Sequence, residues 1–214
     1  MENNWANDFY KMQYEFIGDY PKGYHTESAN EILEQAGKPV QSILELGAWD
    51  GSLARVLSKY VDQITTVELI KEMANKAESL NPDNIETIHG SFYDVNLTEK
   101  FDAIIYIDGF GVGTDEDQLK LLKNIKYWME DGGCALIDVY QPEHWKKADG
   151  IEMYLNRRDM PHIKRRYSYD FEADIMMDTW WHEKDEKLNS TQYLKCYTPD
   201  EIYKLCKQAG LNII

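Results

Sequence analysis

The sequence is poor in basic residues and in cysteine, and it has no long apolar run. Lys and Arg number 23 against 38 Asp and Glu, which gives a formal net charge of −15. Proteins that bind nucleic acids or anionic membranes gather Lys and Arg, so this balance argues against both as partners. No apolar stretch approaches the roughly 18 residues that a membrane helix needs. We therefore expect a protein that acts on a small molecule.

The three cysteines indicate a cell compartment but no site. Cys134, Cys196 and Cys206 have neither the spacing of metal ligands nor that of a disulfide framework. We expect no metal centre and a reducing environment. The N-terminus lacks the basic and apolar regions of a signal peptide. The sequence therefore predicts a cytoplasmic protein.

Strands and helices alternate through the first two thirds of the chain. A length of 214 residues suits a single domain. Short apolar runs bounded by turns predict buried strands, and apolar residues at helical spacing lie between them. The predicted strands cover 42–46, 64–67, 85–88, 101–107 and 134–139. This order predicts an α/β fold, a Rossmann-like doubly wound and mostly parallel sheet.

Beyond residue 150 the pattern changes to alternation with period two. Such alternation over 162–170, 174–181 and 191–197 predicts a small antiparallel β-meander inserted after the fifth strand. The chain then divides into an aromatic segment without regular pattern, a core, the insertion, and a final helix with the start of a strand. These parts cover 1–25, 26–150, 151–197 and 198–214.

Several helix ends carry recognisable signals. Ser28 with Glu31, and Thr198 with Glu201, have the spacing of a capping box at a helix start. The helix before the fifth strand is expected to close at the glycine pair 132–133, because glycine commonly ends helices.

The strongest functional signal is a glycine-containing turn between the first strand and the next helix. A dinucleotide-binding fingerprint would need glycine in place of Trp49, whose side chain would obstruct a pyrophosphate. The spacing of Glu45, Gly47 and Gly51 instead resembles motif I of the class I S-adenosylmethionine-dependent methyltransferases, with Trp49 replacing the middle glycine. The resemblance covers residues 26–140 and implies S-adenosylmethionine as cofactor and S-adenosylhomocysteine as product.

The ends of the following strands carry side chains in the order that the resemblance implies. Glu68 stands where an acidic residue accepts the ribose hydroxyls, and Ser91 and Phe92 stand where the adenine is held. The flanking segments look like the small-molecule branch, in which an N-terminal segment bearing tyrosines folds over the cofactor. The implied cofactor-binding residues are Tyr14, Tyr24, Glu45, Gly47, Ala48, Gly51, Glu68, Leu69, Ser91, Phe92 and Asp108.

Methyl transfer from a sulfonium needs alignment more than acid–base chemistry, and a base only if the acceptor must lose a proton. His144 and Tyr140, just after the fifth strand, are the candidate catalytic residues. Glu143 or Asp138 are alternatives for holding an acceptor ammonium. An amine acceptor, and hence N-methylation, is one interpretation, and the choice between N-, O- and C-methylation stays open.

The meander offers aromatic side chains with two interpretations. Trp180, Trp181 and Tyr193 either line an acceptor pocket or form the core of the small sheet. Two other functions also stay open, a nicotinamide-dependent oxidoreductase and a non-catalytic interaction module. The sheet of the resembled family has further strands after the fifth, and here only 211–214 are available. An exposed sheet edge favours pairing, so we expect a homodimer.

Overall fold

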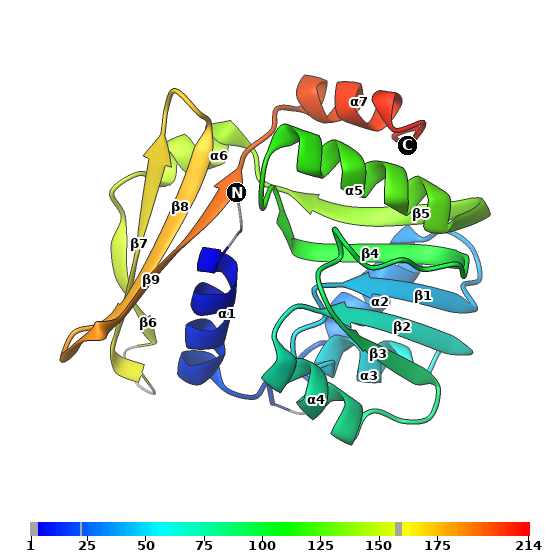
Figure 1. Ribbon diagram of the computed structural model, residues 1–214, viewed down its shortest axis with the longest axis horizontal. Coiled ribbons are helices and arrows are strands. Elements are labelled where there is room, and N and C mark those ends of the chain that lie inside the picture. The colour runs from blue at the N-terminus through cyan, green and yellow to red at the C-terminus, as the bar shows by residue number, and fades with distance from the viewer. Residues whose placement is uncertain (1–3, 22, 157–159) are drawn as a thin grey trace.

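The computed structural model describes residues 4–21, 23–156 and 160–214, and it contains two separate sheets (Figure 1). The larger sheet is parallel, with strand order β3-β2-β1-β4-β5. Its strands are β1 (Ser42–Leu46), β2 (Gln63–Glu68), β3 (Ile85–His89), β4 (Phe101–Phe110) and β5 (Met129–Val139). The expected Rossmann-like architecture is confirmed.

Helices cover both faces of this sheet, because its strands are apolar on both sides. Ile43 faces one cluster of buried side chains and Leu44 the other, and both are fully buried. One cluster includes α2 (Thr26–Gln35) and α3 (Ser52–Leu57), and the opposite one includes α5 (Asp115–Trp128) and α7 (Pro199–Gln208). Helix α4 (Lys71–Leu80) packs beside β3. The strands are thereby held rigidly, with their carboxyl ends free to carry a site.

The second sheet is the expected antiparallel meander, but it has one strand more than predicted. Its order is β6-β7-β8-β9. The strands are β6 (Glu152–Asn156), β7 (Met160–Asp170), β8 (Ile175–His182) and β9 (Asp185–Lys195). Strand β6 escaped the sequence analysis because it is short and none of its residues is buried, so it lacks the clear alternation of its neighbours.

The N-terminal segment is helical, which corrects the expectation of an irregular segment over 1–25. Helix α1 (Asn4–Ile17) lies between the meander and the parallel sheet (Figure 1). Trp5, Phe9, Met12 and Phe16 recur at helical spacing and pack against the meander side. The ring of Phe9 meets that of Trp180 edge to face, with centroids 6.0 Å apart. The aromatic composition concealed a regular amphipathic helix.

Two helix ends differ from prediction. Helix α5 stops at Trp128 rather than at the glycine pair, because Met129 is already extended and pairs with Phe101 of β4. Gly132 has φ 78° and lies within β5 where the register shifts, so it serves a bulge instead of a helix end. Helix α2 begins at Thr26 without a side-chain cap, so the box predicted at Ser28 does not form.

The remaining differences lie after β5. The capping box of Thr198 and Glu201 is confirmed at the start of α7. The segment after β5 contains α6 (Pro142–Ala148), a helix that the sequence analysis did not predict. Residues 211–214 form no strand, and among the described strands none pairs with the outer edge of β5.

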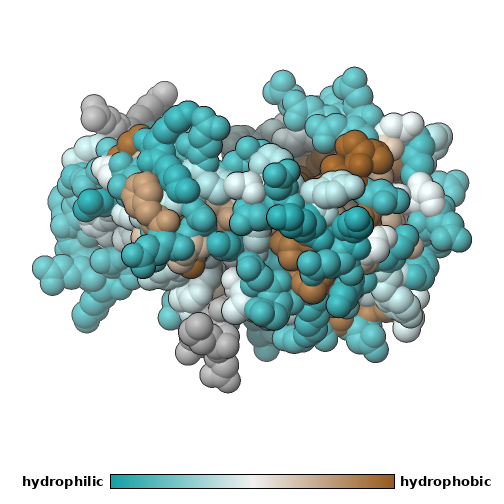
Figure 2. Space-filling model, turned by 90° about the horizontal axis from the view of Figure 1, so that it is seen from above, coloured by the Kyte–Doolittle hydropathy of each residue, from teal (hydrophilic) through white to brown (hydrophobic). Residues whose placement is uncertain are grey.

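The surface agrees with the high content of charged residues, 29% of the sequence. In the view of Figure 2 most side chains are hydrophilic, and the hydrophobic patches are small and separate. Of the helices in the described ranges, none has the length and apolar character to cross a bilayer.

Candidate functional site

A cavity of about 1670 Å³ extends over the carboxyl ends of β1, β2 and β4 and continues along the open edge of β5. Helix α1 borders it through Ala6, Asn7, Tyr10 and Gln13. Ligands of open α/β sheets bind at this edge, where neighbouring strands diverge. Most of the predicted cofactor-binding residues reach this cavity.

The turn after β1 has the backbone that its glycines predict. Gly47 and Gly51 have φ 74° and 75°, in the left-handed region that glycine enters at no steric cost. Trp49 also has a left-handed backbone, with φ 52°. It therefore keeps the conformation of the glycine that it replaces, and a side chain there carries a cost of order 1–3 kcal/mol.

The Trp49 side chain leans away from the turn toward the N-terminal segment. Its ring lies edge-on to Tyr14, with centroids 5.7 Å apart, and 6.5 Å from the ring of Tyr20. Its indole Nε1 is buried and has no hydrogen-bond partner within the described structure, and Trp49 and Ala48 both line the cavity. The turn thus offers one unused buried donor beside the site.

Glu68 joins the end of β2 to this turn. Its Oε2 accepts a hydrogen bond from the Trp49 backbone N–H at 2.8 Å, and its Oε1 accepts one from the Ile70 N–H at 2.8 Å. Burial raises the pKa of the Glu68 carboxyl to about 7, and the two N–H groups oppose that rise. Glu68 lines the cavity, so each carboxylate oxygen has a lone pair left for a ligand hydroxyl.

Glu45 is the other buried acid of the site. It lies on β1, is 5% exposed, and lines the cavity, and its Oε2 has no hydrogen-bond partner in the described structure. Burial raises the pKa of its carboxyl to about 8, and the nearby Glu68 and Asp50 add to the rise. An orphaned buried carboxylate calls for a donor or a cation. The amino group of an S-adenosylmethionine molecule meets that requirement.

The ends of β2 and β3 supply the residues expected around an adenine. Leu69, Ser91 and Phe92 line the cavity. The Phe92 ring packs against Tyr106, with centroids 4.9 Å apart, and Ser91 Oγ accepts a hydrogen bond from the Tyr93 N–H at 3.2 Å. These contacts hold an aromatic face at the rim of the site.

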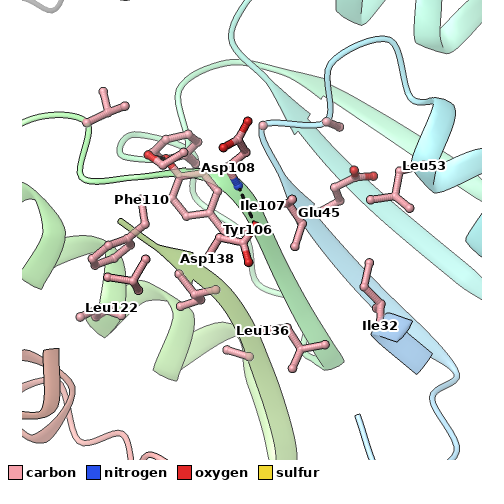
Figure 3. A pocket seen from close by; sticks show the side chains of 18 of the residues that line it. Ile32, Glu45, Leu53, Tyr106, Ile107, Asp108, Phe110, Leu122, Leu136 and Asp138 are labelled. Atoms are coloured by element: carbon pink, nitrogen blue, oxygen red, sulfur yellow. Dashed lines mark hydrogen bonds between the residues drawn. The ribbon is translucent and has the colours of Figure 1, made fainter. Parts of the chain in front are cut away.

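Asp108 closes the row of strand ends. Its backbone has φ 58°, and its N–H donates to an Asp138 carboxylate oxygen at 3.3 Å (Figure 3). The Tyr140 hydroxyl donates a hydrogen bond to Asp108 Oδ1. Desolvation raises the pKa of Asp108, and the hydrogen bond from Tyr140 opposes the rise. The fold therefore places Tyr140, a predicted catalytic residue, in a hydrogen bond with Asp108, a predicted cofactor-binding residue.

Of the two N-terminal tyrosines predicted to bind the cofactor, one lines the cavity as the structure describes it and the other does not. Tyr24 lines the cavity but is 61% exposed, stacked on Tyr20 with centroids 4.7 Å apart. Tyr14 is not among the described residues that line the cavity; its hydroxyl bonds to Lys76 and Asp19, and its ring supports Trp49.

Two tyrosines of the N-terminal segment line the cavity although the sequence analysis did not assign them to the site. Tyr20 and Tyr10 both reach it, and the Tyr10 hydroxyl accepts a hydrogen bond from Gln192 of β9 at 3.0 Å. The helical spacing of α1 was the available signal for Tyr10, because it places Tyr10 one position after the buried Phe9.

Other expected residues lie outside the cavity. His144 is exposed on α6, with its ring against Trp145, and is absent from the cavity lining as far as the structure describes it. Gly51 caps α3 behind the turn. Trp180 is 2% exposed in the packing between meander and α1, and Tyr193 is 41% exposed beside Trp5. For Trp180 the structure favours core packing over a pocket.

The cavity is strongly acidic. Its carboxylates are Glu31, Glu45, Glu68, Asp94, Asp108, Asp117, Glu130 and Asp138, against the two lysines Lys120 and Lys126. Such a field favours ligands with positive charge. Across the described residues, no group of three or more His, Cys, Asp or Glu is arranged to hold a metal ion.

Known proteins share both sequence and fold with this chain. An uncharacterized methyltransferase of Staphylococcus carnosus (strain TM300) is 25% identical over 135 residues, which span 62% of this chain and 62% of that protein. The chain thus matches less than two thirds of that relative's length.

Two solved structures have the same fold. The CcbJ methyltransferase from Streptomyces caelestis has a TM-score of 0.77 at 17% identity, with 100% of this chain and 89% of that chain covered. The S-adenosylmethionine-bound CalS10, an amino pentose methyltransferase from Micromonospora echinaspora, has a TM-score of 0.69 at 18% identity, covering 94% and 88%. The model of the methyltransferase domain family matches residues 20–214. Because this match spans more than half of the chain, the protein belongs to the methyltransferase domain family, and its resemblance to the S-adenosylmethionine-dependent methyltransferases is confirmed.

Proposed function

We propose that this protein transfers the methyl group of S-adenosylmethionine to an amine nitrogen of a small molecule. The observation that carries the cofactor site is the pair of buried carboxylates beside the glycine-containing turn. Glu45 has an oxygen without a partner, and Glu68 is fixed by two backbone N–H groups. Together they suit a ligand with an ammonium at one end and a diol at the other.

Each part of the cofactor has residues of this chain suited to hold it. We assign the amino group to Glu45, the ribose hydroxyls to Glu68, and the adenine to Leu69, Ser91 and Phe92. When bound, S-adenosylmethionine supplies an electrophilic methyl group on a positively charged sulfur. The chain's own contribution is to align the reactants and to exclude water, and α1 borders the cavity where it would do so.

The assignment of an amine acceptor is supported by charge. The acidic lining of the cavity favours a cationic ligand over an anionic one. CalS10, whose fold this chain shares, is an amino pentose methyltransferase. An amine needs no oxyanion stabilisation, only delivery of its neutral form to the methyl group.

Calorimetry with S-adenosylhomocysteine tests the cofactor site. We expect binding that strengthens from pH 6 to pH 8, because a ligand ammonium pairs with the ionised form of Glu45, whose pKa is about 8 in the free protein. The variant E45Q should reduce this pH dependence to the part that comes from Glu68, whose pKa is about 7, and E34Q, at an exposed position on α2, should keep it in full.

NADH serves as the comparison ligand. Binding of NADH in place of S-adenosylhomocysteine would favour the oxidoreductase alternative. S-Adenosylhomocysteine binding without methylation of any amine, hydroxyl or carboxylate acceptor would favour the non-catalytic module.

We also propose a homodimer. The outer edge of β5 is unpaired among the described strands, and unpaired edges recruit further strands. Light scattering at high concentration should give twice the monomer mass, and a monomer mass would contradict the proposal.

A further inference from the structure

The Asp108 carboxylate faces the cavity and is incompletely used by the protein. Asp108 lines the cavity and is accessible to solvent there. Among the described residues only Tyr140 donates a side-chain hydrogen bond to it, at Oδ1. The other oxygen is therefore left for a ligand.

The backbone at Asp108 is held in an unfavourable conformation. Its φ of 58° is in the left-handed region, which costs a non-glycine residue of order 1–3 kcal/mol. Asp138 accepts the Asp108 N–H, which helps to hold this turn at the end of β4. The sheet thus fixes a carboxylate at the rim where the strand ends.

Among the described residues, no Lys, Arg or His forms a salt bridge with Asp108 in the structure. Arg165, a positive charge that acts on Asp108, is already paired with Asp178 through two contacts, of which Nε to Oδ1 is 3.2 Å. The titratable and charged groups that face Asp108 from the surrounding elements are Tyr10, Tyr20, Tyr106, Asp138, Tyr140, Arg165, Tyr167 and Asp178. Phenols and carboxylates dominate this set, so the site is suited to receive a positively charged group.

We propose that Asp108 is a catalytic residue that binds the ammonium form of the acceptor and removes its proton. This inference rests on the proposed function. The ammonium gives its proton to the carboxylate, and the neutral nitrogen then forms a bond to the methyl carbon as the carbon–sulfur bond breaks. The product is a methylated ammonium beside a neutral thioether, and the proton on Asp108 leaves to solvent through the open cavity.

Tyr140 is a positioning residue in this scheme. Its hydroxyl holds Asp108 and stabilises the charged carboxylate, whereas desolvation raises the pKa of Asp108 and so favours uptake of a proton. The resemblance had implied contact of Asp108 with the cofactor, so cofactor affinity has to be measured separately from methyl transfer.

The test uses D108N, because Asn tolerates the left-handed backbone almost as well as Asp. D62N, at an exposed position remote from the cavity, is the matched control. The assay measures S-adenosylhomocysteine release from S-adenosylmethionine with glucosamine, ethanolamine and glycine, and with the neutral compounds glucose and ethylene glycol. S-Adenosylhomocysteine binding is measured by calorimetry, and folding by circular dichroism.

We expect D108N to bind S-adenosylhomocysteine within about twofold of the wild type and to lose on the order of 10²–10⁴-fold in kcat at pH 7. Its activity should recover as the pH rises toward the pKa of the free amine, about 10 for an alkyl amine, because neutral amine then arrives from solution. Y140F should shift the acidic limb of the pH profile of kcat/KM upward, since the carboxylate loses a stabilising hydrogen bond.

The inference about Asp108 is overturned, with the proposed function intact, if the wild type methylates an amine and D108N keeps wild-type kcat/KM, or if D108N loses cofactor affinity. The proposed function itself fails if the wild type does not bind S-adenosylhomocysteine, or if it methylates none of the amines or only the neutral compounds.

Discussion

Glu68 and Trp49 are joined by a hydrogen bond of 2.8 Å, from the Trp49 backbone N–H to Glu68 Oε2. The acid at the end of β2 therefore supports the turn that follows β1, as well as facing the cavity. The turn is held from the side of its partner strand, at the one position where a tryptophan replaces a flexible glycine.

Replacing Glu68 should consequently affect both binding and stability. E68A leaves the N–H groups of Trp49 and Ile70 without partners, at about 1–3 kcal/mol each, and removes the acceptor proposed for the ribose. E68Q keeps one carbonyl oxygen and should lose less stability. Urea unfolding and S-adenosylhomocysteine calorimetry measure the two effects, and unchanged affinity in E68Q would remove Glu68 from the cofactor site.

The stability of the cofactor-free protein should depend on Glu45. Its pKa is about 8 when folded and 4.5 in the reference state, so between these values the unfolded chain releases a proton that the folded protein keeps. The free energy of unfolding then falls by about 1.4 kcal/mol for each pH unit from this group.

E45Q removes that loss. It should match the wild type near pH 4.5 and exceed it at pH 8, as measured by urea unfolding without ligand. Equal stabilities at pH 8 would show that Glu45 has an ordinary pKa.

The left-handed backbone at Trp49 distinguishes two truncations. W49A and W49G both lose the packing against Tyr14 and Tyr20. Glycine adopts φ 52° without steric cost, so W49G should be about 1 kcal/mol more stable than W49A despite its more flexible unfolded chain. Thermal unfolding of the two variants, each compared with the wild type, measures the difference. A more stable W49A would mean that the turn relaxes to an ordinary backbone.

Replacing His144 and replacing Tyr140, the two predicted catalytic residues, should have different effects on activity. His144 is exposed on α6 and is not among the described residues that line the cavity. We expect H144A to keep kcat/KM within about twofold, since exposed side chains remote from the reactants contribute little to the barrier. If H144A lost as much kcat as D108N, His144 would have to act at the site, and α6 would have to move to bring it there.

The sequence alone determined the parallel sheet and predicted which strand ends carry the cofactor site. Buried parallel strands need continuous apolar runs, and left-handed turns need glycine. The local sequence therefore predicts β1, β2 and the turn around Gly47 and Gly51. Because the carboxyl ends of parallel strands lie at one edge of the sheet, the predicted strand order was enough to place Glu45 and Glu68 close together.

Only the tertiary structure decided what surrounds that edge. Whether an aromatic segment forms a helix, and what that helix contacts, depends on packing between α1 and a meander that is about 180 residues away in sequence. Tyr10 enters the cavity because Gln192 and Trp180 fix α1 from the other side. Asp108 is separated from Tyr140 by 32 residues, and no local pattern records their hydrogen bond. Contacts between side chains of distant elements depend on how the elements pack. The spacing of residues within one element does not reveal that packing.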